Sequence, residues 1–95
     1  MHASIWSFGG DPDDLLRRYD AMVETLLPSS PMHLCLRTSE GIMLVDTCPS
    51  REAFREFAEG DAFRALRERF GLPEPDRLDD YPVHVALIGG RPIRR

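Results

Sequence analysis

Alternating and continuous apolar positions predict four β-strands along the chain. Residues 2–8 mix β-branched and aromatic side chains and end at a glycine pair. Residues 32–38 alternate apolar and polar side chains with the period of two that is typical of a half-buried strand. Residues 42–47 and 81–88 are short apolar runs. We expect them to be the third and fourth strands.

Two segments carry apolar residues at spacings of three and four, as amphipathic helices do. The first is expected to begin at Asp11, whose side chain can cap the helix, and to end near Leu27, before a proline. The second begins after Ser50, which can act as its N-cap, and is interrupted at Gly60. Gly71 is well suited to end it, because glycine readily adopts the left-handed conformation found there.

The segments between the predicted strands and helices are short turns and loops. Residues 39–41 fit a three-residue hairpin in which Gly41 adopts the left-handed conformation, and residues 71–80, rich in proline and acidic side chains, predict a loop. The element order is therefore βαββαβ. Two right-handed crossovers give a four-stranded antiparallel sheet in the order 4-1-3-2 with both helices on one face. This is the ferredoxin-like α+β fold, formed by residues 1–95 as one domain.

Charge and composition narrow the classes of function. The 95 residues carry 12 arginines, no lysine and 16 acidic residues, a formal net charge of −4. Nucleic acids and anionic membranes attract clustered positive charge, so we expect neither as a partner. No segment approaches the roughly 20 apolar residues of a membrane-spanning helix. The N-terminus also lacks the features of a signal peptide, which predicts a cytoplasmic protein.

Missing residue types exclude further chemistry. The chain has no lysine, asparagine or glutamine, so a lysine Schiff base, a P-loop and side-chain amide chemistry are excluded. The two cysteines lack the C-x-x-C spacing of zinc and redox sites. We predict no bound metal and no cofactor, although His33 and Cys35 form a pair of possible metal ligands on one strand.

Three segments match a family pattern. They are Gly41-Ile-Met-Leu-Val-Asp, Ser50-Arg-Glu-Ala-Phe-Arg-Glu-Phe and Tyr81-Pro-Val-His. In this order and spacing they resemble the dimeric α/β-barrel superfamily, which includes the antibiotic-biosynthesis-monooxygenase-like proteins. The resemblance implies a ferredoxin-like chain that pairs into a dimeric barrel. That barrel hosts monooxygenases, isomerases, cyclases, haem enzymes and non-catalytic effector modules.

The hairpin predicts which side chains share a face of the sheet. With Thr38 opposite Ile42, six side chains of the second and third strands share one face, and Asp46 lies on the other. The six are His33, Cys35, Arg37, Met43, Val45 and Thr47. Such a face suits a pocket that orients a polar group. It equally suits an edge strand that polar residues protect from further pairing.

His33 and His84 are candidate general bases, and Arg37 is a candidate group to stabilise an anion. His84 could equally donate to a backbone carbonyl or line an interface. In the order 4-1-3-2 the two histidines lie at opposite edges of the sheet, about 14 Å apart, so they cannot share a metal or a proton within one chain. His2 is expected to be unordered. The candidate substrate-binding side chains, each alternatively a core or interface residue, are Trp6, Tyr19, Cys35, Met43 and Tyr81.

Both helices cover one face of the expected sheet, so the other face would expose large apolar side chains. Soluble monomers rarely expose such a patch, and we therefore expect a homodimer with sheets packed face to face.

Three classes of function are compatible with these observations. The first is a small cofactor-independent enzyme, of monooxygenase, cyclase or isomerase type, acting on an apolar or polycyclic small molecule. The alternatives are a non-catalytic homodimeric module that binds a small molecule or a protein, and a homodimeric scaffold.

Overall fold

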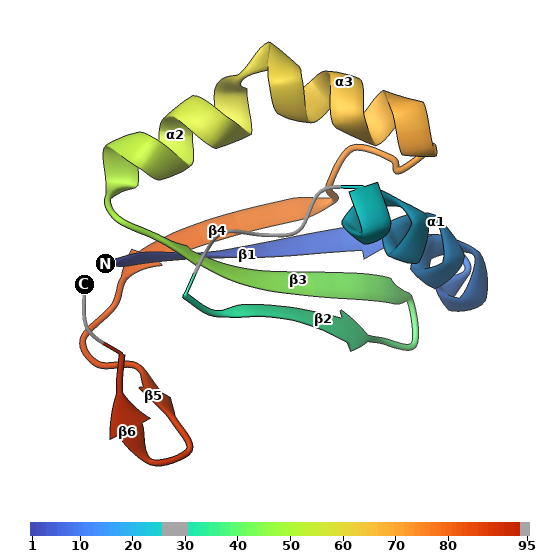
Figure 1. Cartoon of the computed structure of the whole chain (residues 1–95). Helices are drawn as coiled ribbons and strands as arrows, with labels where there is room; N and C mark the ends of the chain where they lie inside the picture. The colour runs from blue at the N-terminus through green and yellow to red at the C-terminus, as the bar shows by residue number, and fades with distance from the viewer. Residues whose placement is uncertain (26–30, 94–95) are drawn as a thin grey trace.

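Three helices cover one face of a four-stranded antiparallel sheet, and the other face is open (Figure 1). The computed structural model describes residues 1–25 and 31–93. The elements are β1 (His2–Gly9), α1 (Pro12–Thr25), β2 (His33–Arg37), β3 (Gly41–Cys48), α2 (Arg51–Glu59), α3 (Asp61–Phe70), β4 (Arg77–Pro82), β5 (Leu87–Ile88) and β6 (Arg91–Pro92). The sheet order β2-β3-β1-β4 is the predicted order 4-1-3-2 and confirms the ferredoxin-like α+β fold.

The residues predicted to delimit the helices do so. The Asp11 and Ser50 side chains accept backbone N–H groups in the first turns of α1 and α2, at 3.0 and 3.1 Å. Gly60 separates α2 from α3, and Gly71 ends α3 with φ 73°, a left-handed conformation that favours glycine. The predicted end of the first helix near Leu27 lies outside the described residues.

The prediction for the fourth strand was wrong. β4 (Arg77–Pro82) begins within the segment expected to be a loop and overlaps the predicted strand only at Tyr81 and Pro82, so residues 81–88 are not a continuous strand. In its pairing with β4, β1 begins at His2 opposite Pro82, and one further bond joins Val83 N–H to Met1 O at 3.0 Å. Beyond that point the chain leaves the sheet, and β5 and β6 form a separate hairpin.

The predicted turn between β2 and β3 was one residue too long. Thr38 N–H donates to Gly41 O at 3.0 Å, so two residues form the turn and His33 pairs with Asp46 rather than Thr47. Since side chains alternate along a strand, this shift moves every β3 side chain to the opposite face relative to β2. The side chains that share the helix-facing side with His33 are Cys35, Arg37, Ile42, Leu44 and Asp46. Those on the open face are Leu34, Leu36, Met43, Val45 and Thr47.

Gly41 lies in β3, and close packing explains why it is a glycine. A Cβ atom on Gly41 would lie 1.9 Å from the carbonyl oxygen of Phe8, on the neighbouring strand β1. No side chain fits there unless the two central strands move apart.

We therefore expect Gly41→Ala to lower the free energy of unfolding by about 1–3 kcal/mol, measured by urea denaturation. Ser39→Ala, in the adjoining turn, is the control and should change it by less than about 0.5 kcal/mol. Equal stability of the two variants would contradict this explanation.

The helix-facing side of the sheet forms the core. Alternate residues of β1, from His2 to Phe8, are buried there, and they include Trp6 at the centre. The core cluster consists of Trp6, Phe8, Leu15, Tyr19, Met22, Ile42, Leu44, Phe54, Phe63 and Leu72. Burying these side chains is the main stabilising contribution to the fold.

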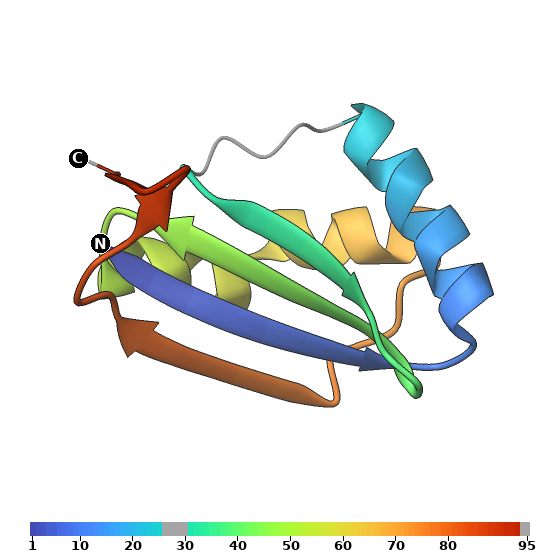
Figure 2. The same cartoon turned by 90° about the horizontal axis from the view of Figure 1, so that it is seen from below.

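The open face carries exposed apolar side chains. Leu34 and Leu36 on β2 are 46% and 41% exposed, and Tyr81 on β4 is 54% exposed. The hairpin β5–β6 projects on this side of the sheet, away from the helices (Figures 1 and 2).

In the described part of the chain, no helix is both long and apolar enough to cross a membrane.

Candidate functional site

A row of four polar residues crosses the helix-facing side of the sheet. The strand pairings place His33 opposite Asp46, Asp46 opposite Ser4, and Ser4 opposite Asp80. Each strand therefore contributes one residue, and we call these four residues the polar row. Polar groups next to an apolar core are costly unless they find partners. Their hydrogen bonds show how each is accommodated.

At the β2 end of the row, His33 connects a carboxylate to a phenol. Its Nδ1 lies 3.3 Å from Asp46 Oδ1, and its Nε2 lies 2.6 Å from Tyr19 Oη on α1. The Tyr19 and His33 rings are parallel, with an interplanar angle of 3° and centroids 6.0 Å apart. The carboxylate favours a proton on Nδ1, so Nε2 accepts a hydrogen bond from the Tyr19 hydroxyl. Asp46, His33 and Tyr19 form a continuous chain for moving a proton.

Burial and nearby negative charge keep the neighbouring acidic groups protonated. Burial, together with Cys35, Asp20 and Asp46, raises the pKa of Tyr19 to about 12. Burial and Asp20 raise the pKa of the Cys35 thiol to about 11. At neutral pH Tyr19 is therefore a hydrogen-bond donor. Cys35 is a thiol rather than a thiolate nucleophile.

These shifts predict a loss of stability at high pH. Both pKa values are higher in the folded protein than in an unfolded chain, so folding favours the protonated forms. The resulting stabilisation is complete below the ordinary pKa values and is lost as pH rises through about 11 to 12. Urea denaturation between pH 8 and 12 should show this loss. Tyr19→Phe should reduce it, whereas Tyr81→Phe on the open face should not; equal effects would contradict the assignment.

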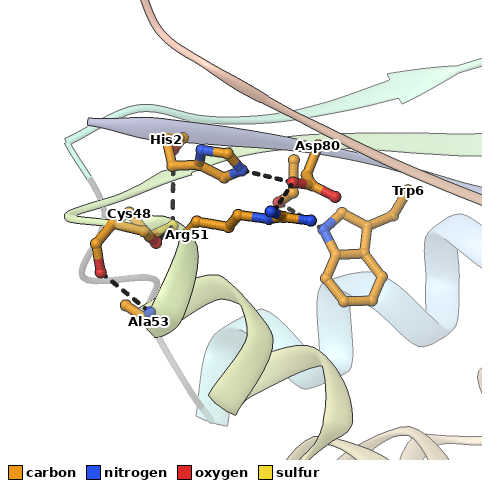
Figure 3. Close-up of polar contacts among 8 residues, drawn as sticks. His2, Trp6, Cys48, Arg51, Ala53 and Asp80 are labelled. Atoms are coloured by element: carbon orange, nitrogen blue, oxygen red, sulfur yellow. Dashed lines mark hydrogen bonds and ion pairs between the residues drawn. The ribbon is translucent and has the colours of Figure 1, made fainter.

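At the β4 end of the row, a second histidine pairs with a carboxylate (Figure 3). His2 Nε2 lies 2.6 Å from Asp80 Oδ1, and Arg51 Nε lies 3.8 Å from the same oxygen. His2 is buried and its ring lies 5.9 Å from that of Phe54. The expectation that His2 is unordered was therefore wrong, because β1 starts at this residue. The Cys48 thiol also donates to the carbonyl oxygen of His2, at 3.6 Å.

Trp6 joins the polar row to an aromatic cluster. Its indole N–H donates to Ser4 Oγ at 2.8 Å, and its ring meets Phe54, Phe57 and Phe63 edge to face with centroids 5.0–6.1 Å apart. Phe57 is half-exposed, so this cluster reaches the surface.

The structure brings together half of the residues proposed from the sequence. Those on the helix-facing side, around the polar row, are His33, Trp6, Tyr19 and Cys35. Arg37 is at the far end of β2, exposed, and paired with Asp13 at 2.7 Å. Met43 and Tyr81 lie on the open face. His84 follows β4 and belongs to no strand, so it does not lie at the sheet edge opposite His33.

Sequence reasoning missed Asp80, His2 and the pairing of Asp46 with His33. Asp80 was placed in a loop, and the turn error placed Asp46 on the wrong face. The shorter turn brings the Asp46 carboxylate to His33, with Oδ1 3.3 Å from Nδ1. Among residues 1–25 and 31–93, no three His, Cys, Asp or Glu side chains are grouped so as to hold a metal ion.

The fold is similar to that of a solved structure. A crystal structure described as a candidate antibiotic biosynthesis monooxygenase from Chloroflexus aurantiacus J-10-fl superposes with a TM-score of 0.62. The match covers 93% of this chain and 98% of that one, at 13% sequence identity. At this identity the likeness concerns the fold alone, which is the ferredoxin-like arrangement described above. No protein-family model and no curated protein matches the chain.

Proposed function

We propose that the protein is a small cofactor-independent monooxygenase that removes a proton from an apolar, polycyclic molecule held between the helices and the sheet. The hydrogen-bonded chain from Asp46 through His33 to Tyr19 carries this proposal. The aromatic cluster around Trp6 adds an apolar surface beside that chain. The similar fold of a candidate antibiotic biosynthesis monooxygenase supports the class of reaction.

In the proposed mechanism Tyr19 touches the substrate and His33 stores the proton. The substrate gives a proton to Tyr19 Oη while the Tyr19 hydroxyl proton moves to His33 Nε2, 2.6 Å away. The imidazolium that forms is stabilised by the Asp46 carboxylate on its other nitrogen. The His33 and Asp46 side chains are 20% and 30% exposed, so solvent can take the proton afterwards.

The substrate supplies all the electrons in this reaction. A CH2 group flanked by a carbonyl-conjugated ring system loses a proton, and its carbanion reacts with O2. The CH2 carbon becomes a carbonyl carbon and loses four electrons, which O2 accepts. One oxygen atom enters the carbonyl group and the other leaves as water, so no external reductant is needed.

Anthrone, a tricyclic ketone with such a CH2 group, is a suitable test substrate. We expect the protein to accelerate O2 consumption above the uncatalysed rate and to form one anthraquinone per O2. Labelled O2 should place one labelled oxygen in the quinone, and treatment with a chelator should leave the rate unchanged. No acceleration with anthrone or with related tricyclic phenols would contradict the proposed function.

We also propose that two copies pair through their open sheet faces. The exposed Leu34, Leu36 and Tyr81 side chains support this, because pairing would remove them from water. Light scattering should then give twice the 10.8 kDa mass of one chain. Leu34→Glu combined with Leu36→Glu should give a folded monomer, whereas Arg64→Glu on the helical side should not. A wild-type mass of one chain at micromolar concentration would contradict the dimer.

A non-catalytic binding module is the second candidate. Apolar exposure on the hairpin β5–β6 and the segment before it favours this function, since Val85, Leu87 and Ile88 are more than half exposed. Such a surface suits a protein partner better than a reaction. If this function is correct, no oxygen will be consumed, and His33→Ala will leave the affinity for every ligand and partner unchanged.

A further inference from the structure

Arg67 is a buried arginine whose charge has no partner in the described residues. It lies on the inner face of α3, one turn after Phe63, and is only 8% exposed. Its Nε is completely covered and has no hydrogen-bond partner there. No aspartate or glutamate in the described part of the chain pairs with it. A guanidinium stays charged in proteins, so this charge cannot be removed by losing a proton.

Arg67 is the one buried arginine among the described residues. Exposed arginines of the described residues pair with aspartates, where water already screens their charge: Arg17, Arg18, Arg37, Arg51, Arg64 and Arg77. Acidic residues outnumber arginines in the chain, so carboxylates are not scarce. Residues 26–30 and 94–95, which lie outside the described ranges, contain no aspartate or glutamate.

The surroundings of Arg67 are aromatic. Its guanidinium carbon lies 5.6 Å from the centre of the Phe63 ring. The Phe63 ring is in turn 5.0 Å from Trp6 and 4.6 Å from Phe57. The contact with Phe63 is a cation–π interaction, which compensates only part of the cost of burying a charge. A planar anion would compensate it better, because a guanidinium can donate two parallel hydrogen bonds to a carboxylate.

We propose that Arg67 binds the oxyanion of an aromatic ligand, a carboxylate or phenolate attached to rings that pack against Trp6, Phe57 and Phe63. The proposal rests on the proposed function and narrows its substrates to anionic aromatic molecules. Phe57 is half-exposed and marks where the rings of such a ligand reach the aromatic cluster. The anion would supply the counter-charge that the chain itself does not.

Matched pairs of small aromatic probes test this directly by calorimetry. The probes are benzoate, 1-naphthoate and 9-anthroate, each compared with its neutral amide. The wild type should bind at least one carboxylate about 10- to 100-fold more tightly than its amide, the range expected for a charge-assisted hydrogen bond. Absence of a carboxylate preference at all three ring sizes would overturn the proposal.

Two variants of α3 separate Arg67 from the general charge of the helix. Arg67→Met should abolish the preference for the carboxylate and unfold at or above the wild-type temperature without ligand, because it removes an unpaired buried charge. Arg69→Met is the matched control, since Arg69 is exposed and its guanidinium lies 5.0 Å from the Phe70 ring. It should keep the preference. Retention of the preference in Arg67→Met would overturn the proposal. Arg67→Leu, which also lacks the charge, gives the same test if the methionine variant does not fold.

Binding is measured without turnover, so the two proposals can fail separately. His33→Ala should retain the carboxylate preference while it loses oxygen consumption. If the protein consumes oxygen with neutral substrates but shows no preference for carboxylates, the proposed function stands. The proposed role of Arg67 is then wrong. The converse result would leave an anion-binding protein that does not oxidise its ligand.

Discussion

His33→Ala is expected to lower the rate of anthrone oxidation by about 10²- to 10⁴-fold, the usual contribution of a positioned proton acceptor. The variant removes the group that joins Tyr19 to Asp46, so the proton from the substrate has no base to reach. Steady-state O2 consumption, with the uncatalysed rate subtracted, measures the effect.

Two further variants separate the contributions of Tyr19 and Asp46 to the proposed proton transfer. Tyr19→Phe removes the hydroxyl that meets the substrate, and we expect a loss as large as that of His33→Ala because the two groups act in sequence. Asp46→Asn keeps a hydrogen-bond acceptor without the negative charge, so it should cause a smaller loss.

Histidine substitution elsewhere provides the control. His84→Ala should leave the rate unchanged, because His84 lies beyond β4 and outside the sheet. A large loss in His84→Ala with little loss in His33→Ala would place the chemistry outside the polar row and contradict the mechanism.

The fold was predictable because its signals are local. Asp11 and Ser50 begin helices, Gly60 and Gly71 interrupt and end them, and alternation along residues 32–38 predicts an edge strand. Each of these signals acts within a few residues. The order of elements then allows few topologies, and the right-handed crossover rule selects the one observed.

The site was less predictable because it depends on register. A hairpin with one residue fewer in its turn moved Asp46 from the face opposite His33 to the same face. β3 also pairs with β1, and a Cβ atom on Gly41 would meet the Phe8 carbonyl oxygen there, a contact between distant segments that no local pattern contains. In the same way β4 depends on its pairing with the distant strand β1, which runs from Ser7 opposite Arg77 to His2 opposite Pro82.

Arg67 did leave a signal in the sequence. It stands four residues after Phe63 and three before Phe70, which places a charge on the apolar side of a helix. An arginine in such a position is often assumed to extend to the surface along its methylene groups. Here the residue is only 8% exposed and its Nε is covered beside Phe63, and only the packing of α3 against the core shows this.

Trp6→Ala is expected to lower the free energy of unfolding by about 3–5 kcal/mol, the usual cost of removing a large aromatic side chain from a core. Trp6 is 4% exposed, and its ring packs against Phe54 on α2 and Phe63 on α3. Trp6 therefore joins β1 to both α2 and α3. A domain of this size is stable by roughly 5–15 kcal/mol, so the loss is a large share of the total. Urea denaturation followed by circular dichroism measures it, because the variant has no other tryptophan.

Two milder substitutions separate the contributions to the stability that Trp6 provides. Trp6→Phe keeps a ring in the cluster and removes the N–H that donates to Ser4, so it should cost about 1–2 kcal/mol. Phe57→Ala removes a half-exposed member of the same cluster and should cost less than half as much as Trp6→Ala. A loss below about 1 kcal/mol for Trp6→Ala would contradict the packing of this cluster. Because Trp6→Phe should remain folded, any change in its oxygen consumption would report on the Ser4 hydrogen bond, which ties the aromatic cluster to the polar row.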